Sequence, residues 1–148
     1  MGLVGSKGHM KTIICLYGGA GIGKTSSIRA VWDRLNISNQ PPLHQSADDI
    51  CAIVPFCNST IGIASQGDPY SAQDEWLEEL MNLGCEIIVC ASRTKGSTVD
   101  AVEDVAQRGE YVTIWFSPFY SSDSVNTNVL NNLTADSVIE LIRKCLIH

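Results

Sequence analysis

Apolar residues gather in short runs along the chain, and most of these runs have the length of a β-strand. Between them lie segments in which apolar residues recur every three or four positions, which is the spacing of an amphipathic helix. Runs and helical segments alternate for most of the sequence. The runs predict five strands, at residues 11–17, 50–56, 60–65, 85–91 and 111–116.

The helical segments have recognisable starts and ends. The first runs from Lys24 to Leu35, directly after a glycine-rich stretch. Ser71 and Ser97 stand where an N-cap is expected for the second and third helices. We expect a fourth helix to open at Thr134, after a loop rich in serine and asparagine. The sequence therefore predicts four helices in alternation with the strands.

Strands that alternate with helices indicate an α/β protein with helices on both faces of a mostly parallel sheet. We therefore predict a three-layer α/β/α sandwich around five strands. Only three residues separate the runs 50–56 and 60–65, which indicates a hairpin. Pro55 cannot donate to a β-ladder, so 50–56 is expected as an antiparallel edge strand. With strands numbered along the chain, we expect the order 2-3-1-4-5.

Size and charge limit the class of protein. The 148 residues favour one domain, which we place at 10–148, with the glycine-rich residues 1–9 interpreted as an expression leader. No apolar run approaches the ~20 residues of a spanning helix, so we expect no membrane insertion. The net charge of −6 and the scattered Lys and Arg argue against non-specific nucleic-acid binding. The six cysteines lack metal-ligand spacing, and we expect free thiols in the cytoplasm.

Residues 16–25 read LYGGAGIGKT and carry the most informative chemistry of the chain. Glycines let consecutive main-chain N–H groups turn toward one point and bind a polyphosphate. The helix that starts beside them adds unpaired N–H groups and its dipole. Lys24 adds a positive charge for the β- and γ-phosphates, and the Thr25 hydroxyl is a ligand for Mg²⁺. The predicted phosphate-binding residues are Gly18, Gly19, Ala20, Gly21, Ile22, Gly23, Lys24 and Thr25.

The spacing G-x-x-x-x-G-K-T from Gly18 to Thr25 is the Walker A pattern. On this motif the chain resembles the P-loop NTPase superfamily, and residues 11–36 carry the resemblance. The resemblance implies a P-loop fold, a nucleoside triphosphate as ligand, Mg²⁺ as cofactor, and Ser26 beside the α-phosphate. It does not specify a subfamily.

The family also places a carboxylate at the end of a strand to hold the magnesium shell. The run 60–65 ends in Ala64 and Ser65 instead. We predict that Asp68 takes this role, either on Mg²⁺ through water or by orienting a nucleophile. The alternative is turn chemistry, since Gly67-Asp68-Pro69 also suits a loop before a helix.

Two cations follow the predicted strand 85–91, at the same edge of the sheet as the glycine loop. We predict that Arg93 stabilises charge on a transferred phosphoryl group or binds the phosphate of an acceptor. Lys95 lies near enough in sequence to share this site. The alternative is that both are solvated loop cations, which need no function.

Other polar and aromatic residues receive structural interpretations. We interpret Asp48 and Asp49 as charges that solubilise the approach to an edge strand, with metal or acceptor binding as the alternative. Trp76 and Trp115 are interpreted as core residues. The aromatic residues of the stretch 116–120 either pack near a base or plug the end of the sheet.

No N-K-x-D motif is present to read guanine, so ATP is favoured over GTP. We expect a small Mg²⁺-dependent NTPase in which Lys24, Asp68 and Arg93 are catalytic and Thr25 and Asp68 hold the metal. One alternative is a P-loop kinase that transfers the γ-phosphate to a small acceptor. The loop 36–49 contains no arginine, which argues against a nucleotide as that acceptor. The other is a nucleotide-dependent switch or binding module that works through a protein partner.

Overall fold

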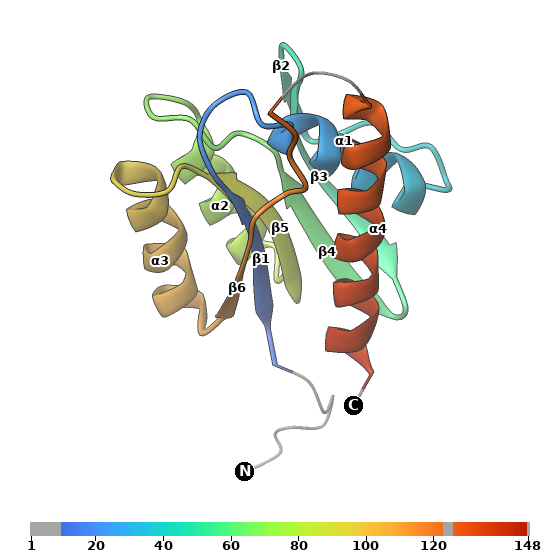
Figure 1. Ribbon diagram of the computed structural model, residues 1–148. Helices are drawn as coiled ribbons and strands as arrows, with labels where there is room; N and C mark the ends of the chain where they lie inside the picture. The colour runs from blue at the N-terminus through green and yellow to red at the C-terminus, as the bar shows by residue number, and fades with distance from the viewer. Residues whose placement is uncertain (1–9, 123–125, 148) are drawn as a thin grey trace.

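A computed structural model describes residues 10–122 and 126–147; the expected leader at 1–9 lies outside them. In these residues the chain forms one six-stranded sheet, ordered β2-β3-β4-β5-β1-β6, with helices on both faces (Figure 1). The strands are β1 (Thr12–Tyr17), β2 (His44–Ser46), β3 (Asp49–Phe56), β4 (Ser59–Ala64), β5 (Ile87–Ser92) and β6 (Val112–Phe116). The helices are α1 (Lys24–Leu35), α2 (Gln73–Asn82), α3 (Ser97–Gly109) and α4 (Thr127–Leu146).

Strands β1 and β5 form the centre of the sheet. Both are near-continuous apolar runs, as expected of parallel strands that helices cover on both faces. Every residue of β5 is buried, and so is every residue of β1 except Tyr17. β1 pairs in parallel with β5 and β6, and β4 pairs in parallel with β5. The predicted α/β class with a mostly parallel sheet is confirmed.

The predicted strand order is wrong at the centre. We expected β1 between β4 and β5, whereas β5 lies between β4 and β1, and β6 pairs with the other side of β1. Right-handed crossovers allow both orders. Because the runs that form β1 and β5 are equally apolar, their pattern does not reveal which of them lies beside β4.

The short strand β2 was not predicted, because its residues HQS are all exposed and carry no apolar alternation. It pairs antiparallel with residues 49–51 at the start of β3. Pro55 lies outside the residues that pair with β2. The part of β3 that contains Pro55 is therefore an edge of the sheet, as expected. His44 attaches β2 to α2, since its ring stacks on Trp76 at 6.1 Å and its Nε2 lies 2.6 Å from Glu79 Oε1.

Each face of the sheet has its own apolar core. Helices α1 and α4 cover one face, and α2 and α3 cover the other. Helix α4 begins at Thr127 and not at Thr134 as expected. Thr134 is fully buried inside this helix, and its hydroxyl accepts a hydrogen bond from the Phe119 N–H at 3.0 Å. The residues before Thr134 form an exposed or half-buried extension of the helix that is rich in polar side chains, so no apolar spacing marks it in the sequence.

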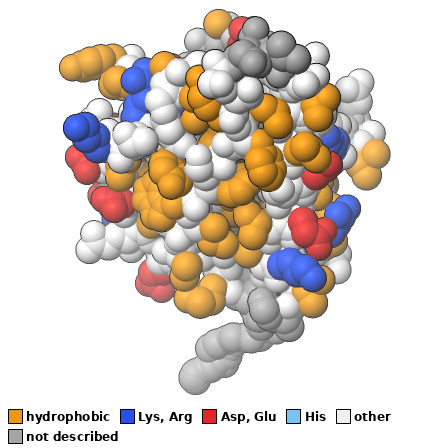
Figure 2. Space-filling view, viewed as in Figure 1, with side chains coloured by type: hydrophobic (Ala, Val, Ile, Leu, Met, Phe, Trp, Pro, Cys, Tyr) orange, Lys and Arg blue, Asp and Glu red, His pale blue; other side chains and the backbone are white. Residues whose placement is uncertain are grey.

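Strand β6 is the exposed edge of the sheet. Figure 2 shows apolar side chains gathered on the face between α3 and α4. Trp115 is 39% exposed, and its ring packs edge-on against Tyr17 at 6.2 Å. The interpretation of Trp115 as a core residue is therefore wrong, because an edge strand has a neighbour on one side only. Trp76 is buried as expected, at 6% exposure.

Burial also governs the cysteines, which are all free. Cys15, Cys51, Cys85 and Cys90 are buried in the sheet and against its helices, whereas Cys57 is exposed. Burial raises the pKa of the Cys51 and Cys85 thiols to about 12. Of the helices in the described part of the chain, none has the length and apolar character required to cross a membrane.

The loop after β4 is held against the main chain of β5 at Gly67. A Cβ atom at Gly67 would lie 2.6 Å from the carbonyl carbon of Ala91 and 2.8 Å from its oxygen. Main-chain atoms inside a sheet cannot shift to make room. We predict that Gly67→Ala lowers the free energy of unfolding by about 1–3 kcal/mol, measured by urea denaturation.

Gly19→Ala is the matched control, because a Cβ atom there meets nothing within 4 Å. Equal urea midpoints for the two variants would contradict the close packing of Gly67 on β5.

Candidate functional site

The glycine-rich loop 18–23 connects β1 to α1 at the carboxyl edge of the parallel strands (Figure 1). Gly18, Gly21 and Gly23 have φ angles of 152°, 79° and 90°. At Gly23 two features exclude a side chain. Its φ angle is one that other residues rarely adopt, and a Cβ atom there would lie 2.5 Å from Asn131 Oδ1 of α4. A loop with such residues, followed by a helix, can turn several N–H groups toward one anion.

Lys24 reaches back from the first turn of α1 to the ends of two strands. Its Nζ donates hydrogen bonds to the carbonyl oxygen of Gly18 and, at 2.9 Å, to that of Ser92. The side chain is 7% exposed, and burial lowers the pKa of Lys24, an effect that Asp68 opposes and Arg93 strengthens. Described carbonyl groups thus accept two of the three N–H donors of this ammonium.

The hydroxyl of Thr25 donates to a carboxylate that we had not selected as the metal-site residue. Thr25 Oγ1 lies 3.1 Å from Asp49 Oδ1. The same carboxylate oxygen accepts a hydrogen bond from Ser65 Oγ at 2.7 Å. Ser65 is itself buried, and its Oγ accepts from the Ile50 N–H at 2.9 Å. Asp49 is therefore held against the first turn of α1. Its interpretation as a charge that only solubilises an edge strand is wrong.

The antiparallel direction of β3 explains how Asp49 reaches this place. The ends of β4 and β5 lie at the carboxyl edge of the sheet, and β3 runs the opposite way and begins there. In the register, Cys51 lies opposite Ala64, so Asp49 stands just beyond the end of β4. The predicted hairpin was the signal that could have found it, because a hairpin brings the start of one strand beside the end of the other.

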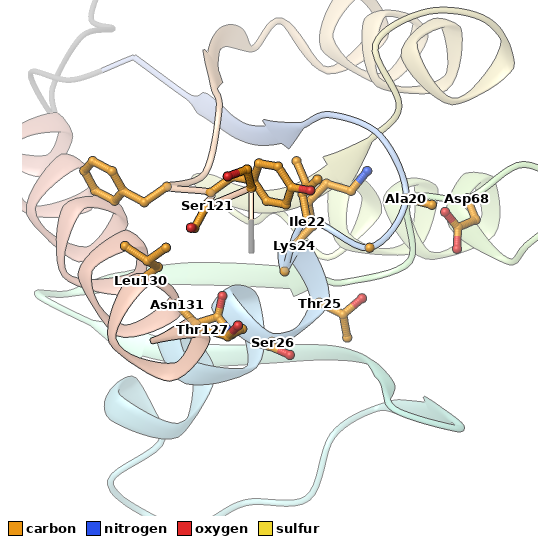
Figure 3. Close-up of a pocket in the computed structure, with 15 residues that line it drawn as sticks. Ala20, Ile22, Lys24, Thr25, Ser26, Asp68, Ser121, Thr127, Leu130 and Asn131 are labelled. Carbon is orange, nitrogen blue, oxygen red and sulfur yellow. The ribbon is translucent and has the colours of Figure 1, made fainter. Parts of the chain in front are cut away.

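Asp68 and Arg93 form an ion pair on another side of the loop. Arg93 Nε donates to Asp68 Oδ1 at 3.0 Å, with the side chains 35% and 64% exposed. Asp68 lies next to Ala20 in Figure 3, away from Thr25 and Ser26. The hydrogen bond to Thr25 that a magnesium-shell carboxylate would make is thus made by Asp49 and not by Asp68.

A buried glutamine, not selected from the sequence, positions the Arg93 loop. Gln73 is 3% exposed, and its Nε2 donates to the carbonyl oxygens of Ala91 and Thr98, both at 3.0 Å. Thr98 Oγ1 in turn accepts from the Arg93 N–H at 2.9 Å. These bonds join the end of β5 to the start of α3, and so fix where Arg93 leaves the sheet.

Among the described residues, three hollows adjoin different sides of the loop. The largest of these three, about 590 Å³, lies between the loop and residues 119–122 with the first turns of α4 (Figure 3). A second, about 480 Å³, adjoins Thr25 and Asp49. A third, about 340 Å³, lies beside Gly19 and Arg93 and includes Lys95. Of the predicted site residues, the largest hollow collects Ala20, Gly21, Ile22, Gly23, Lys24, Thr25, Ser26 and Asp68.

A divalent metal at Thr25 would have few protein ligands. Among the described residues, no three His, Cys, Asp or Glu side chains are grouped closely enough to hold a metal ion. The Thr25 hydroxyl and the Asp49 carboxylate are hard oxygen donors on one side of the loop. Mg²⁺ is commonly bound by one or two protein oxygens, with water and substrate phosphates completing its shell. The donor set therefore fits Mg²⁺, provided that a phosphate ligand supplies the rest.

No protein-family model matches the chain, and no curated protein matches its sequence.

Proposed function

We propose that the protein binds a nucleoside triphosphate through residues 18–26 and is a small Mg²⁺-dependent NTPase of the P-loop type. The proposal rests on one observation: three features lie together at one edge of the sheet. These are a glycine loop with left-handed residues, the buried ammonium of Lys24, and the Thr25 hydroxyl bonded to Asp49. A polyphosphate requires main-chain donors, a full positive charge and a metal site together.

Each residue of this group has a task toward the triphosphate. The loop N–H groups and the N-terminus of α1 would bind phosphate oxygens, and Ser26 would lie beside the α-phosphate. Lys24 would neutralise charge between the β- and γ-phosphates. Thr25 and Asp49 would hold Mg²⁺, which when bound supplies positive charge to the phosphate oxygens. Asp49 orients the Thr25 hydroxyl, and Ser65 orients Asp49.

Arg93 is the candidate for stabilising charge that develops on the transferred phosphoryl group. It leaves the end of β5, the neighbour of the strand that enters the loop. Its pairing with Asp68 keeps the guanidinium at the rim of the phosphate site. We assign Asp68 as a positioning residue for Arg93, and its expected role on Mg²⁺ or in orienting a nucleophile stays a prediction.

A specific feature also favours a kinase as the second candidate. The hollow beside Gly19 holds Arg93 and Lys95 and lies across the loop from the largest hollow. An acceptor with an anionic group would fit between these cations. ATP consumption that requires an added acceptor would favour transfer to that acceptor over hydrolysis.

We infer the cytoplasm as the compartment. All six cysteines are unpaired, and free thiols are typical of a reducing environment.

The first prediction tests triphosphate binding itself. Lys24→Ala removes the charge-assisted hydrogen bonds to the phosphates, so we expect Mg-ATP affinity to fall by roughly 10- to 100-fold. Isothermal titration calorimetry measures the affinity, and circular dichroism checks that the variant is folded. Undiminished affinity in a folded Lys24→Ala protein would refute the phosphate site.

The second prediction tests whether Asp49, and not the adjacent Asp48, contributes to the metal site. Asp49→Asn removes the carboxylate charge beside Thr25, and we expect Mg²⁺-dependent phosphate release to fall by about 10- to 100-fold. Asp48→Asn is the matched control, because the contact of Asp48 with a described residue is made by its main-chain carbonyl, which accepts from Arg29 at 2.8 Å. Equal activity of the two variants would exclude Asp49 from the metal site.

The third prediction concerns Arg93. In Arg93→Ala we expect turnover to fall by about 100-fold, with little change in KM, because the guanidinium acts mainly on charge that develops during transfer. Asp68→Asn is the control: it weakens the ion pair and keeps the guanidinium, so most of the turnover should remain. A larger loss in Asp68→Asn than in Arg93→Ala would assign the chemistry to Asp68 instead.

A further inference from the structure

The largest hollow extends well beyond the phosphate loop. One side is formed by residues 20–26, and the opposite side by residues 119–122 and the first turns of α4. Figure 3 places Ser121, Leu130 and Asn131 across the loop from Ala20 and Asp68. A triphosphate bound to the loop would fill one end only. We call the remaining surface, formed by residues 119–122 with Thr127, Leu130 and Asn131, the far wall.

The far wall presents two aromatic side chains to the hollow. Phe119 is 48% exposed and Tyr120 is 63% exposed, and both line the hollow. The chain that leads to Tyr120 is anchored: Pro118 is buried, and the Phe119 N–H donates to the buried hydroxyl of Thr134. Exposed rings on an anchored segment offer a flat apolar surface that a ligand can cover at little cost in chain entropy.

Helix α4 joins the far wall directly to the phosphate loop. Asn131 Oδ1 approaches Gly23 so closely that a Cβ atom there would lie 2.5 Å away. Ser27 Oγ, from the first turn of α1, lies 3.5 Å from the same oxygen. One hollow is lined by both the phosphate-binding residues and the aromatic residues of the far wall. It changes along its length from donors and charge to apolar and hydroxyl-bearing side chains.

We propose that the far wall binds the nucleoside, with the base stacked on the ring of Tyr120. This inference rests on the proposed function and adds the substrate class. Stacking scales with ring area and not with the hydrogen-bonding edge of the base, so purine nucleotides bind more tightly than pyrimidine nucleotides. The polar side chains of the wall are hydroxyls and an amide, which both donate and accept hydrogen bonds. The site therefore accepts adenine and guanine with similar affinity, and this inference replaces the expectation from the missing N-K-x-D motif that ATP is favoured over GTP.

The test is a competition assay with the full chain in excess Mg²⁺. A fluorescent ATP analogue labelled on the ribose is displaced by ATP, GTP, CTP or inorganic tripolyphosphate. We expect ATP and GTP to displace it at similar concentrations, CTP to require more, and tripolyphosphate the most. Tyr120→Ala should weaken ATP and GTP on the order of 5- to 100-fold and leave tripolyphosphate unchanged. Tyr120→Phe keeps the ring and is expected to bind ATP like the unmodified protein.

The outcomes separate this inference from the proposed function. If tripolyphosphate competes as well as ATP and Tyr120→Ala changes neither, the nucleoside site is wrong and the phosphate site stands. If ATP is preferred strongly over GTP, stacking is not the source of selectivity and the inference fails. If direct calorimetry detects neither ATP nor tripolyphosphate binding, the proposed function fails. The order among competitors is measured on the unmodified protein, so the result does not depend on how well a variant folds.

Discussion

One buried ammonium holds the site together. Lys24 lies under the glycine loop and donates to carbonyl oxygens at the ends of β1 and β5. A buried charge is costly unless it is hydrogen-bonded, so the loop and both strand ends must keep their positions around it. The loop N–H of Gly18 completes the arrangement by donating to the same Ser92 carbonyl at 3.1 Å. The glycine loop, the first turn of α1 and the ends of β1 and β5 are all arranged around this constraint.

The position of Asp49 illustrates how topology can bring a carboxylate to a strand end that carries none. Strand β4 ends at Ala64 and Ser65 follows it, and neither side chain is a carboxylate. Its antiparallel neighbour β3 begins at the same edge, and its first residue bonds Thr25 directly. Ser65 contributes as well, because its hydroxyl fixes the same carboxylate oxygen. The end of β4 and the start of β3 thus together hold the Asp49 carboxylate beside Thr25.

The ion pair of Asp68 and Arg93 stands between the two hollows that flank the loop. Asp68 lines the large hollow, and Arg93 lines the smaller one beside Gly19. Both side chains are substantially exposed, so the pair adds only about 0–1 kcal/mol to stability. A ligand with several negative charges would compete effectively for the guanidinium. The ion pair therefore holds Arg93 at the rim of the smaller hollow but is weak enough for the guanidinium to change partners.

Sequence alone determined the strand–loop–helix unit around residues 11–35 and the α/β class, because both depend on local patterns: apolar runs, helical spacing and consecutive glycines. Tertiary structure decided the central strand order, the short strand β2, the exposure of Trp115 and the place of Asp49. These depend on which distant segments pair, and apolar runs of equal character do not specify their partners. The far wall was decided in the same way, since only packing brings residues 119–122 and α4 against the glycine loop.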